Sequence, residues 1–271
     1  MGGALDASTN GLFVGNITNS GTIDSEGDSG TTAGIRFVNG VSFQGVLDNS
    51  GTISGVQNGL YFGNPTPEGG GDFSQAIVNN SGTISSGSRA LNIDGVGLTV
   101  NNSGSILGTG NQRNGTVYSD STAQGFSLNN LEGGVIDAGM GNEGAGFSVE
   151  LSAEGNDITI ANAGSVRGRG QAGAGAATAG DGLRFERTRV GGALDGTTTG
   201  LFTGTITNSG EITSESAQGT AAGIRFVNGT SFQGTLDNSG LIAGVQNGLY
   251  FGNPTPAGGG DPTGGVVNNS S

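Results

Sequence analysis

The chain has 271 residues, a net charge of −13, 32% hydrophobic residues, 59 glycines, and neither cysteine nor histidine. These counts exclude disulfides, the usual zinc sites and nucleophile–histidine pairs, and the negative charge disfavours nucleic acid and anionic membranes as partners. No apolar run is long enough to span a bilayer, so we expect no membrane insertion by this segment. We also predict no cofactor and no bound metal.

A short motif recurs along the chain and defines its smallest period. In each copy an asparagine and a glycine form a turn between two apolar residues. The copies are ITNSGTI (Ile17–Ile23), LDNSGTI (Leu47–Ile53), VNNSGTI (Val78–Ile84), VNNSGSI (Val100–Ile106), LNNLEGGVI (Leu128–Ile136), IANAGSV (Ile160–Val166), ITNSGEI (Ile206–Ile212) and LDNSGLI (Leu236–Ile242). The β-branched residue after every turn predicts one stacked column in the core.

A second segment, typified by NGLYF (Asn58–Phe62), lies between successive turn motifs. Strand alternation directs Leu60 and Phe62 to one side and Tyr61 to the other. The apolar pair before each turn, such as Leu98 and Val100, forms another short strand. Each repeat therefore predicts three short strands.

These repeats predict an all-β fold, a parallel β-helix of about nine coils with three short strands per coil. One repeat has too little apolar surface to fold alone, whereas coiling pairs each turn of chain with the turns before and after it. Glycine interrupts every segment, and no 3.6-residue apolar period is sustained, so helices are disfavoured.

A longer repeat contains the short one. Residues 2–72 return as residues 191–261, shifted by 189 positions, and most positions are identical. We predict one continuous solenoid over 1–271, in which 2–190 is a module of about six coils and 191–271 is a partial second copy. The repeat preserves outward residues and loops as well as the core.

Asparagine falls at the same bend in every repeat, which predicts a ladder of stacked side-chain amides. Asparagine tolerates turn conformations, and amides stacked at the strand spacing can hydrogen-bond along a column. The predicted ladder comprises Asn19, Asn49, Asn80, Asn102, Asn130, Asn162, Asn208 and Asn238.

The outward residues of the NGLYF-like strands form a candidate surface contact lane of Arg36, Tyr61, Arg184, Arg225 and Tyr250. Arg36 and Tyr61 fall at one position on successive coils, and Arg225 and Tyr250 repeat that pair. Two interpretations stay open. The lane contacts a sugar or protein partner, or each guanidinium lies over a ring as a cation–π pair that covers the surface.

The NNSGTI and GLYF repeats resemble the passenger regions of bacterial autotransporters. The resemblance covers essentially the whole chain. It implies a right-handed β-helix that is secreted and displayed on the outer membrane of a Gram-negative bacterium. It implies no particular activity, because such repeats occur in adhesins, haemagglutinin-like proteins and passengers of unknown role. The handedness and the extracellular location rest on this resemblance.

Some parallel β-helices act on polysaccharides, so we ask whether the carboxylates of this chain could form a catalytic pair. Glycoside hydrolysis takes two carboxyl groups about 5–10 Å apart. The acidic residues of this chain are scattered, mostly in turns such as Asp48 and Asp237 or in loops such as Asp72. We therefore predict no catalytic residues and no enzyme activity.

The expected function is structural: a rigid, surface-displayed stalk or adhesin for cell adhesion or biofilm formation, with a host or cell-surface glycan or protein as partner. Two alternatives stay open. Because Met1–Gly15 and Val266–Ser271 carry no capping signal, homotypic end-to-end stacking would build a filament or surface layer. The other alternative is a polysaccharide-active β-helix enzyme.

Overall fold

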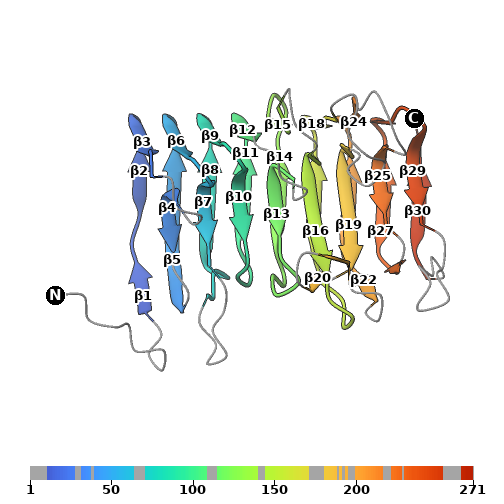
Figure 1. Ribbon diagram of the computed structural model, residues 1–271, viewed down its shortest axis with the longest axis horizontal. Helices are drawn as coiled ribbons and strands as arrows, with labels where there is room; N and C mark the ends of the chain where they lie inside the picture. The colour runs from blue at the N-terminus through green and yellow to red at the C-terminus, as the bar shows by residue number, and fades with distance from the viewer. Residues whose placement is uncertain are drawn as a thin grey trace.

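The computed structural model describes residues 11–27, 32–37, 40–63, 71–108, 115–139, 144–170, 180–187, 189–190, 193–194, 199–215, 221–227, 229–252 and 264–270. Every regular element in these ranges is a strand, and the strands coil into a right-handed parallel β-helix of about nine coils (Figure 1). The prediction of an all-β solenoid with three strands per coil is confirmed. The NPTP segments of the long repeat lie outside the described residues.

The asparagine sheet is the first of three long parallel sheets, and its strands from β2 onward end at the asparagine of the turn motif. Its members, in spatial order, are β1 (Gly11–Val14), β5 (Val41–Asn49), β8 (Ala76–Asn80), β11 (Thr99–Asn102), β14 (Ser127–Asn130), β17 (Thr159–Asn162), β23 (Thr205–Asn208), β27 (Thr235–Asn238) and β30 (Val266–Asn269), with β2 (Ile17–Asn19) paired to β5.

The isoleucine sheet follows the turn in each coil. Its strands are β3 (Thr22–Ser25), β6 (Thr52–Gly55), β9 (Thr83–Ser86), β12 (Ser105–Gly108), β15 (Val135–Asp137), β18 (Ser165–Gly168), β24 (Glu211–Ser214) and β28 (Leu241–Ala243).

The arginine–tyrosine sheet completes each coil. Its strands are β4 (Ala33–Phe37), β7 (Asn58–Phe62), β10 (Arg89–Ile93), β13 (Val117–Ser119), β16 (Phe147–Leu151), β19 (Leu183–Arg187), β25 (Ala222–Phe226) and β29 (Asn247–Phe251). Two small sheets pair β20 (Arg189–Val190) with β21 (Ala193–Leu194), antiparallel, and β22 (Gly200–Phe202) with β26 (Thr230–Phe232), parallel. Figure 1 shows the coils side by side along the long axis, from blue to red.

In-register pairing stacks equivalent residues of successive coils into columns. In the isoleucine sheet, Ile53 pairs with Ile23 on one side and with Ile84 on the other. The same column continues through Ile106, Ile136, Val166, Ile212 and Ile242. This confirms the core column predicted from the turn motif, and burying each such side chain contributes roughly 1.5–3 kcal/mol.

Phenylalanine pairs recur along the core, and one of them is repeated at equivalent positions of the two copies of the long repeat. In the first copy Phe37 stacks on Phe62, with ring centroids 5.2 Å apart. In the second copy Phe226 stacks on Phe251 at 5.1 Å, and it also stacks on Phe185 of the preceding coil, at the end of the first module, at 4.6 Å. Such ring pairs stabilise the core beyond the area that they bury. The long repeat therefore preserves a particular aromatic packing as well as a general apolar pattern.

The glycine of the turn motif is needed because the neighbouring coil leaves no room for a side chain. A Cβ atom at Gly82 would clash with the carbonyl oxygen of Gly51, the equivalent residue one coil earlier. The turn glycines do not have positive φ angles. Close backbone approach between coils, and not an unusual backbone conformation, therefore requires glycine here.

The amide ladder runs along the corner between the asparagine and isoleucine sheets. Each Nδ2 donates to the Oδ1 of the asparagine one coil further along, beginning with Asn19 to Asn49 at 2.8 Å. The series continues at 2.7 or 2.8 Å through Asn80, Asn102, Asn130, Asn162, Asn208 and Asn238 to Asn269. All eight asparagines of the predicted ladder are buried.

Asn102→Ala should lower the free energy of unfolding by about 1–3 kcal/mol, because it leaves the Nδ2 donor of Asn80 and the Oδ1 acceptor of Asn130 buried without these partners. Urea unfolding followed by circular dichroism measures the loss. Asn101→Ala is the matched control, since Asn101 also bonds to asparagines of both neighbouring coils but is only half-buried. Equal losses for the two variants would contradict a special role for the buried ladder.

Candidate functional site

The contact lane is a straight line of side chains across the outer face of the arginine–tyrosine sheet. In-register pairing aligns Arg36, Tyr61, Asn92, Tyr118, Ser148, Arg184, Arg225 and Tyr250. The structure thus brings the five predicted lane residues onto one line and adds Asn92, Tyr118 and Ser148. The sequence analysis missed these three because polar residues of changing type occupy the outward position in β10, β13 and β16.

The lane is exposed at one end and buried through its middle. Arg36 is exposed, and Tyr61 and Tyr250 are half-buried. Arg184 and Arg225, however, are only 7% and 8% exposed. The expectation of a surface lane is therefore wrong at these two arginines. Their side chains are buried and form ion pairs with Asp181 and Glu186.

Cation–π contacts join arginines and tyrosines of successive coils. The guanidinium carbon of Arg36 lies 5.3 Å from the ring centroid of Tyr61, and Arg225 lies 5.2 Å from Tyr250. Arg89 makes a closer contact of 4.1 Å with Tyr118. The second of the two interpretations thus describes a contact that the structure contains, while binding of a partner to the lane stays a proposal.

A row of carboxylates runs beside the lane, two residues after the lane position in four consecutive coils. It consists of Asp94, Asp120, Glu150 and Glu186, and Glu150 pairs in register with Glu186. These residues are scattered in the sequence but aligned in space. The spacing of each lane residue to a carboxylate two positions later, as in Asn92 and Asp94, is the signal that could have revealed the row.

Most carboxylates of this row have a partner from the lane or from their own turn. Tyr118 donates its hydroxyl to Oε1 of Glu150 at 2.6 Å, and Nε of Arg184 donates to Glu186 at 2.9 Å. Oδ1 of Asp120 accepts from the main-chain N–H of Thr122 at 2.9 Å. Burial and the charge of Glu150 raise the pKa of Tyr118, so this phenol stays protonated.

Asp94 differs from its neighbours because it is buried and its Oδ1 has no hydrogen-bond partner. Burial, and then the charge of Asp120, raise the pKa of Asp94 to about 7, although a hydrogen bond with Tyr61 acts in the opposite direction. The folded chain therefore holds a proton on Asp94 in a pH range where an unfolded carboxyl group is ionised.

Further along the lane, two arginines and two acids form a buried ionic cluster. Arg184 bridges Asp181 through Nη1 at 3.1 Å and Glu186 through Nε at 2.9 Å. Nε of Arg225 lies 3.1 Å from Asp181. Burial raises the pKa of Asp181, although the charges of Arg184 and Arg225 act in the opposite direction. Burial lowers the pKa of Arg225. Such buried charges are tolerated only because they are paired.

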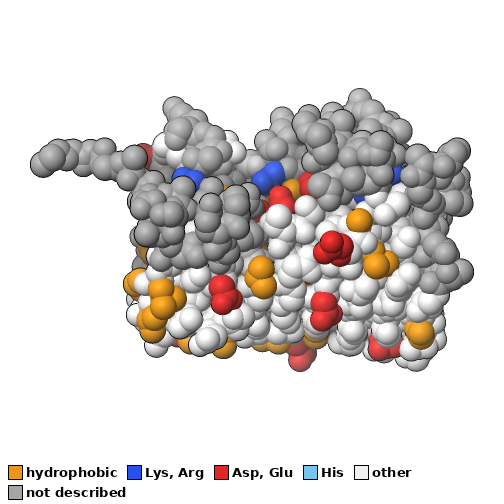
Figure 2. Space-filling model, turned by 90° about the horizontal axis from the view of Figure 1, so that it is seen from below, with side chains coloured by type: hydrophobic (Ala, Val, Ile, Leu, Met, Phe, Trp, Pro, Cys, Tyr) orange, Lys and Arg blue, Asp and Glu red, His pale blue; other side chains and the backbone are white. Residues whose placement is uncertain are grey.

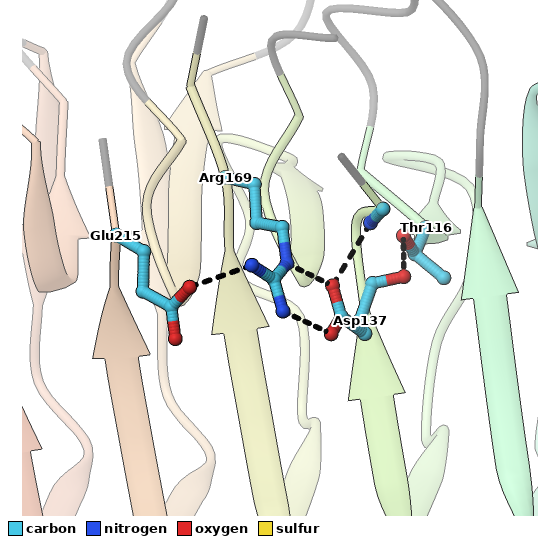
Figure 3. Close-up of polar contacts among 5 residues, drawn as sticks. Thr116, Asp137, Arg169 and Glu215 are labelled. Atoms are coloured by element: carbon cyan, nitrogen blue, oxygen red, sulfur yellow. Dashed lines mark hydrogen bonds and ion pairs between the residues drawn. The ribbon is translucent and has the colours of Figure 1, made fainter. Parts of the chain in front are cut away.

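A second ionic chain crosses three coils where the isoleucine sheet ends. Arg169 donates to both carboxylate oxygens of Asp137, at 2.6 and 2.7 Å, and through Nη1 to Glu215 at 2.6 Å (Figure 3). Burial alone would raise the pKa of Asp137, but the hydrogen bonds from Arg169 and from the main-chain N–H of Gly139 hold it below its usual value. This bidentate pair links neighbouring coils through side chains.

In the coloured part of Figure 2 the surface consists largely of backbone and of side chains that are neither charged nor hydrophobic, with a few acidic and apolar side chains among them and the basic ones near the top. Among the described residues no group of three or more acidic side chains is arranged to hold a metal ion. The same residues include no helix long and apolar enough to cross a membrane.

Comparisons with known proteins add no family to this description. No protein family model, no curated protein and no solved structure matches the chain.

Asp94 predicts a pH dependence of stability. The pKa of Asp94 is higher in the folded chain, at about 7, than the usual 3.8. The contribution of Asp94 to the free energy of unfolding is therefore complete below about pH 4 and is lost as the pH rises through about 7. We expect the thermal unfolding midpoint to fall between about pH 4 and pH 7, and Asp94→Asn to flatten that fall. Glu132→Gln, which removes an exposed carboxylate, is the control. An unchanged slope in Asp94→Asn would refute the assignment.

Proposed function

We propose that the chain is a non-catalytic stalk or adhesin, displayed on the surface of a Gram-negative bacterium and used in cell adhesion or biofilm formation. The observation that supports this most is the continuity of the solenoid. One apolar core, one isoleucine column and one amide ladder run from the first described coil to the last. A structure with that continuity is stiff and can hold a binding surface away from a cell.

Repetition of outer side chains supports the adhesive part of the proposal. The Arg36–Tyr61 contact returns as Arg225–Tyr250 with nearly the same distance. The 189-residue shift spans about six coils, so equivalent surface features recur roughly every 30 Å along the rod. Weak sites repeated on a stiff support gain avidity without any single strong site.

The proposal predicts binding that depends on the number of copies. Beads coated densely with the purified chain should attach to epithelial cells or to biofilm matrix, whereas the free chain at the same concentration should bind weakly. Beads coated with an unrelated protein of similar charge are the control. Attachment no better than the control would contradict adhesion, and release of reducing ends from polysaccharides would favour the enzyme alternative that the carboxylate row keeps open.

A second candidate, end-to-end assembly into a filament or surface layer, is favoured by the last described coil. Leu241, Val266 and Val267 there are 47–49% exposed. Leu241 and Val267 border a hollow that is also lined by Leu236, Ile242 and Leu249. In the first described coil Leu12 and Phe13 are 59% and 42% exposed, so a second copy would cover apolar surface at both ends.

Sedimentation velocity over a wide concentration range distinguishes the filament from the stalk. Association that rises with concentration and weakens in Val267→Lys would support assembly, since a charge would be placed in the joint between copies. Ile77→Lys is the control, since it alters a 38% exposed apolar side chain on β8, a strand that is paired on both sides. A single monomeric species at all concentrations would contradict assembly.

A further inference from the structure

A second ladder of side chains runs along the outer face of the asparagine sheet. In-register pairing aligns the outward residues Thr18, Asp48, Asn79, Asn101 and Asn129 of β2, β5, β8, β11 and β14. Nδ2 of Asn79 donates to Oδ1 of Asp48 at 2.8 Å, and the amides of Asn101 and Asn129 each donate to the asparagine before them, at 2.9 and 2.8 Å. Asp48, Asn79, Asn101 and Asn129 form the outer ladder. Its donors belong to the later coil of each pair, so it runs opposite to the buried ladder.

An open groove lies beside the outer ladder. It is lined by Asp48, Asn79 and Asn101 and by the serines that follow the buried asparagines, Ser50, Ser81 and Ser103. The three serines and Asp48 are exposed, and the two asparagines are half-buried. The groove extends from Thr18 to Leu131, which is four strand spacings or roughly 19 Å. A linear ligand parallel to the axis of the rod can therefore reach these side chains from solvent.

Leu131 closes one end of the groove. The turn that carries it, LNNLEGGVI (Leu128–Ile136), is two residues longer than the other copies of the motif, and the side chain of Leu131 is 45% exposed. Among the described residues that line the groove, Leu131 alone is apolar. The groove thus presents a polar row that ends on one apolar contact.

The outer ladder leaves part of its hydrogen-bonding capacity unused. A side-chain amide carries two N–H donors and two lone pairs on its oxygen. The ladder engages one donor and one lone pair of Asn79 and of Asn101. Asp48 can only accept, and it does so in the ladder through Oδ1. A ligand in the groove must therefore both donate and accept at each coil, and donate toward Asp48.

We propose that this groove binds a neutral, extended oligosaccharide. The proposal rests on the adhesive role above and names the chemical class of its partner. Hydroxyl groups both donate and accept, so the hydroxyls of one sugar match the amide and the serine of one coil. Each sugar of an extended β-linked glucan advances by nearly one strand spacing, and the C–H face of the last ring can pack on Leu131.

Charge and sheet pairing argue against other partners. No described cationic side chain lines the groove, and Asp48 and the net charge of −13 repel acidic sugars. Peptides join sheets through unpaired strand edges, whereas β5, β8 and β11 are paired on both sides. A neutral sugar is the partner that these constraints leave.

The shape of the groove predicts weak binding at each site. Its volume of about 190 Å³ is below the ~300 Å³ of an ordinary small-molecule site, so the sugar is held along one side only. The long repeat returns part of the same surface: Asp237 and Asn268 repeat Asp48 and Asn79, and Nδ2 of Asn268 donates to Oδ1 of Asp237 at 2.6 Å. Weak sites repeated along a rod suit binding by avidity.

The test titrates the isotopically labelled full chain with cellotetraose and follows the side-chain amide signals by nuclear magnetic resonance. We expect saturable shifts for Asn79 and Asn101 at millimolar cellotetraose. Maltotetraose, a neutral glucan whose linkage makes it curve, and tetragalacturonic acid, which is charged, should each bind at least fivefold more weakly. Equal affinity for the three sugars would contradict recognition of an extended neutral chain.

The outer ladder supplies a matched pair of variants. Asn79→Ala should raise the Kd for cellotetraose at least fivefold, because it removes polar contacts in the centre of the groove. Asn129→Ala is the control, since Asn129 belongs to the same ladder but is not part of the groove lining, and its Kd should stay within twofold of the unmodified value. If Asn79→Ala does not fold, Leu131→Ser decides, because it alters an exposed side chain and should raise the Kd at least threefold.

A purely structural outer ladder is the competing explanation. It predicts that Asn79→Ala and Asn129→Ala both lower the free energy of unfolding in urea and that neither changes sugar binding. That result, or no binding at millimolar cellotetraose, would overturn the proposal. Bead adhesion without cellotetraose binding would keep the adhesive role and reject the groove, whereas cellotetraose binding without bead adhesion would keep the groove and reject the adhesive role.

Discussion

The structure depends on one constraint: each residue must tolerate its equivalent residue one strand spacing away on both sides. Apolar β-branched side chains satisfy this by packing, as the column through Ile53 and Ile84 does. Asparagine satisfies it by hydrogen bonding to its own kind, and the turn glycine satisfies it by having no side chain. Stacked parallel strands thus select residues that are compatible with copies of themselves, which explains why so few residue types dominate the chain.

Charge is the property that this constraint penalises most. Two like charges one strand spacing apart repel by about 3–4 kcal/mol at an effective dielectric constant of about 20. The chain keeps its charged fraction at 11%. Where charges do stack, opposite ones join them: Asp181 lies between Arg184 and Arg225, and Arg169 lies between Asp137 and Glu215. Burial and then the charge of Asp120 raise the pKa of Asp94 to about 7, so Asp94 retains its proton below that pH.

The sequence alone predicted what the constraint makes periodic, and it missed what depends on neighbours. The isoleucine column and the positions of the ladder asparagines follow from the period of the turn motif, and the column appears residue for residue. The burial of Arg184 and Arg225 did not follow, because these arginines are paired with Asp181 and Glu186, which lie outside the part of the chain that is repeated. The carboxylate row was missed because its members share a position relative to the lane but differ in residue type and in sequence context.

The amide ladder also gives the rod a direction. Every Nδ2 donor from Asn19 to Asn238 points toward the later coil, so the bond dipoles add along the axis instead of cancelling. A further coil continues the ladder only if it arrives in the same orientation, since a reversed coil would set two donors or two acceptors against each other. Growth of such a solenoid, whether by gene duplication or by contact between chains, is therefore vectorial, and twofold-symmetric joints at its ends are disfavoured by the ladder.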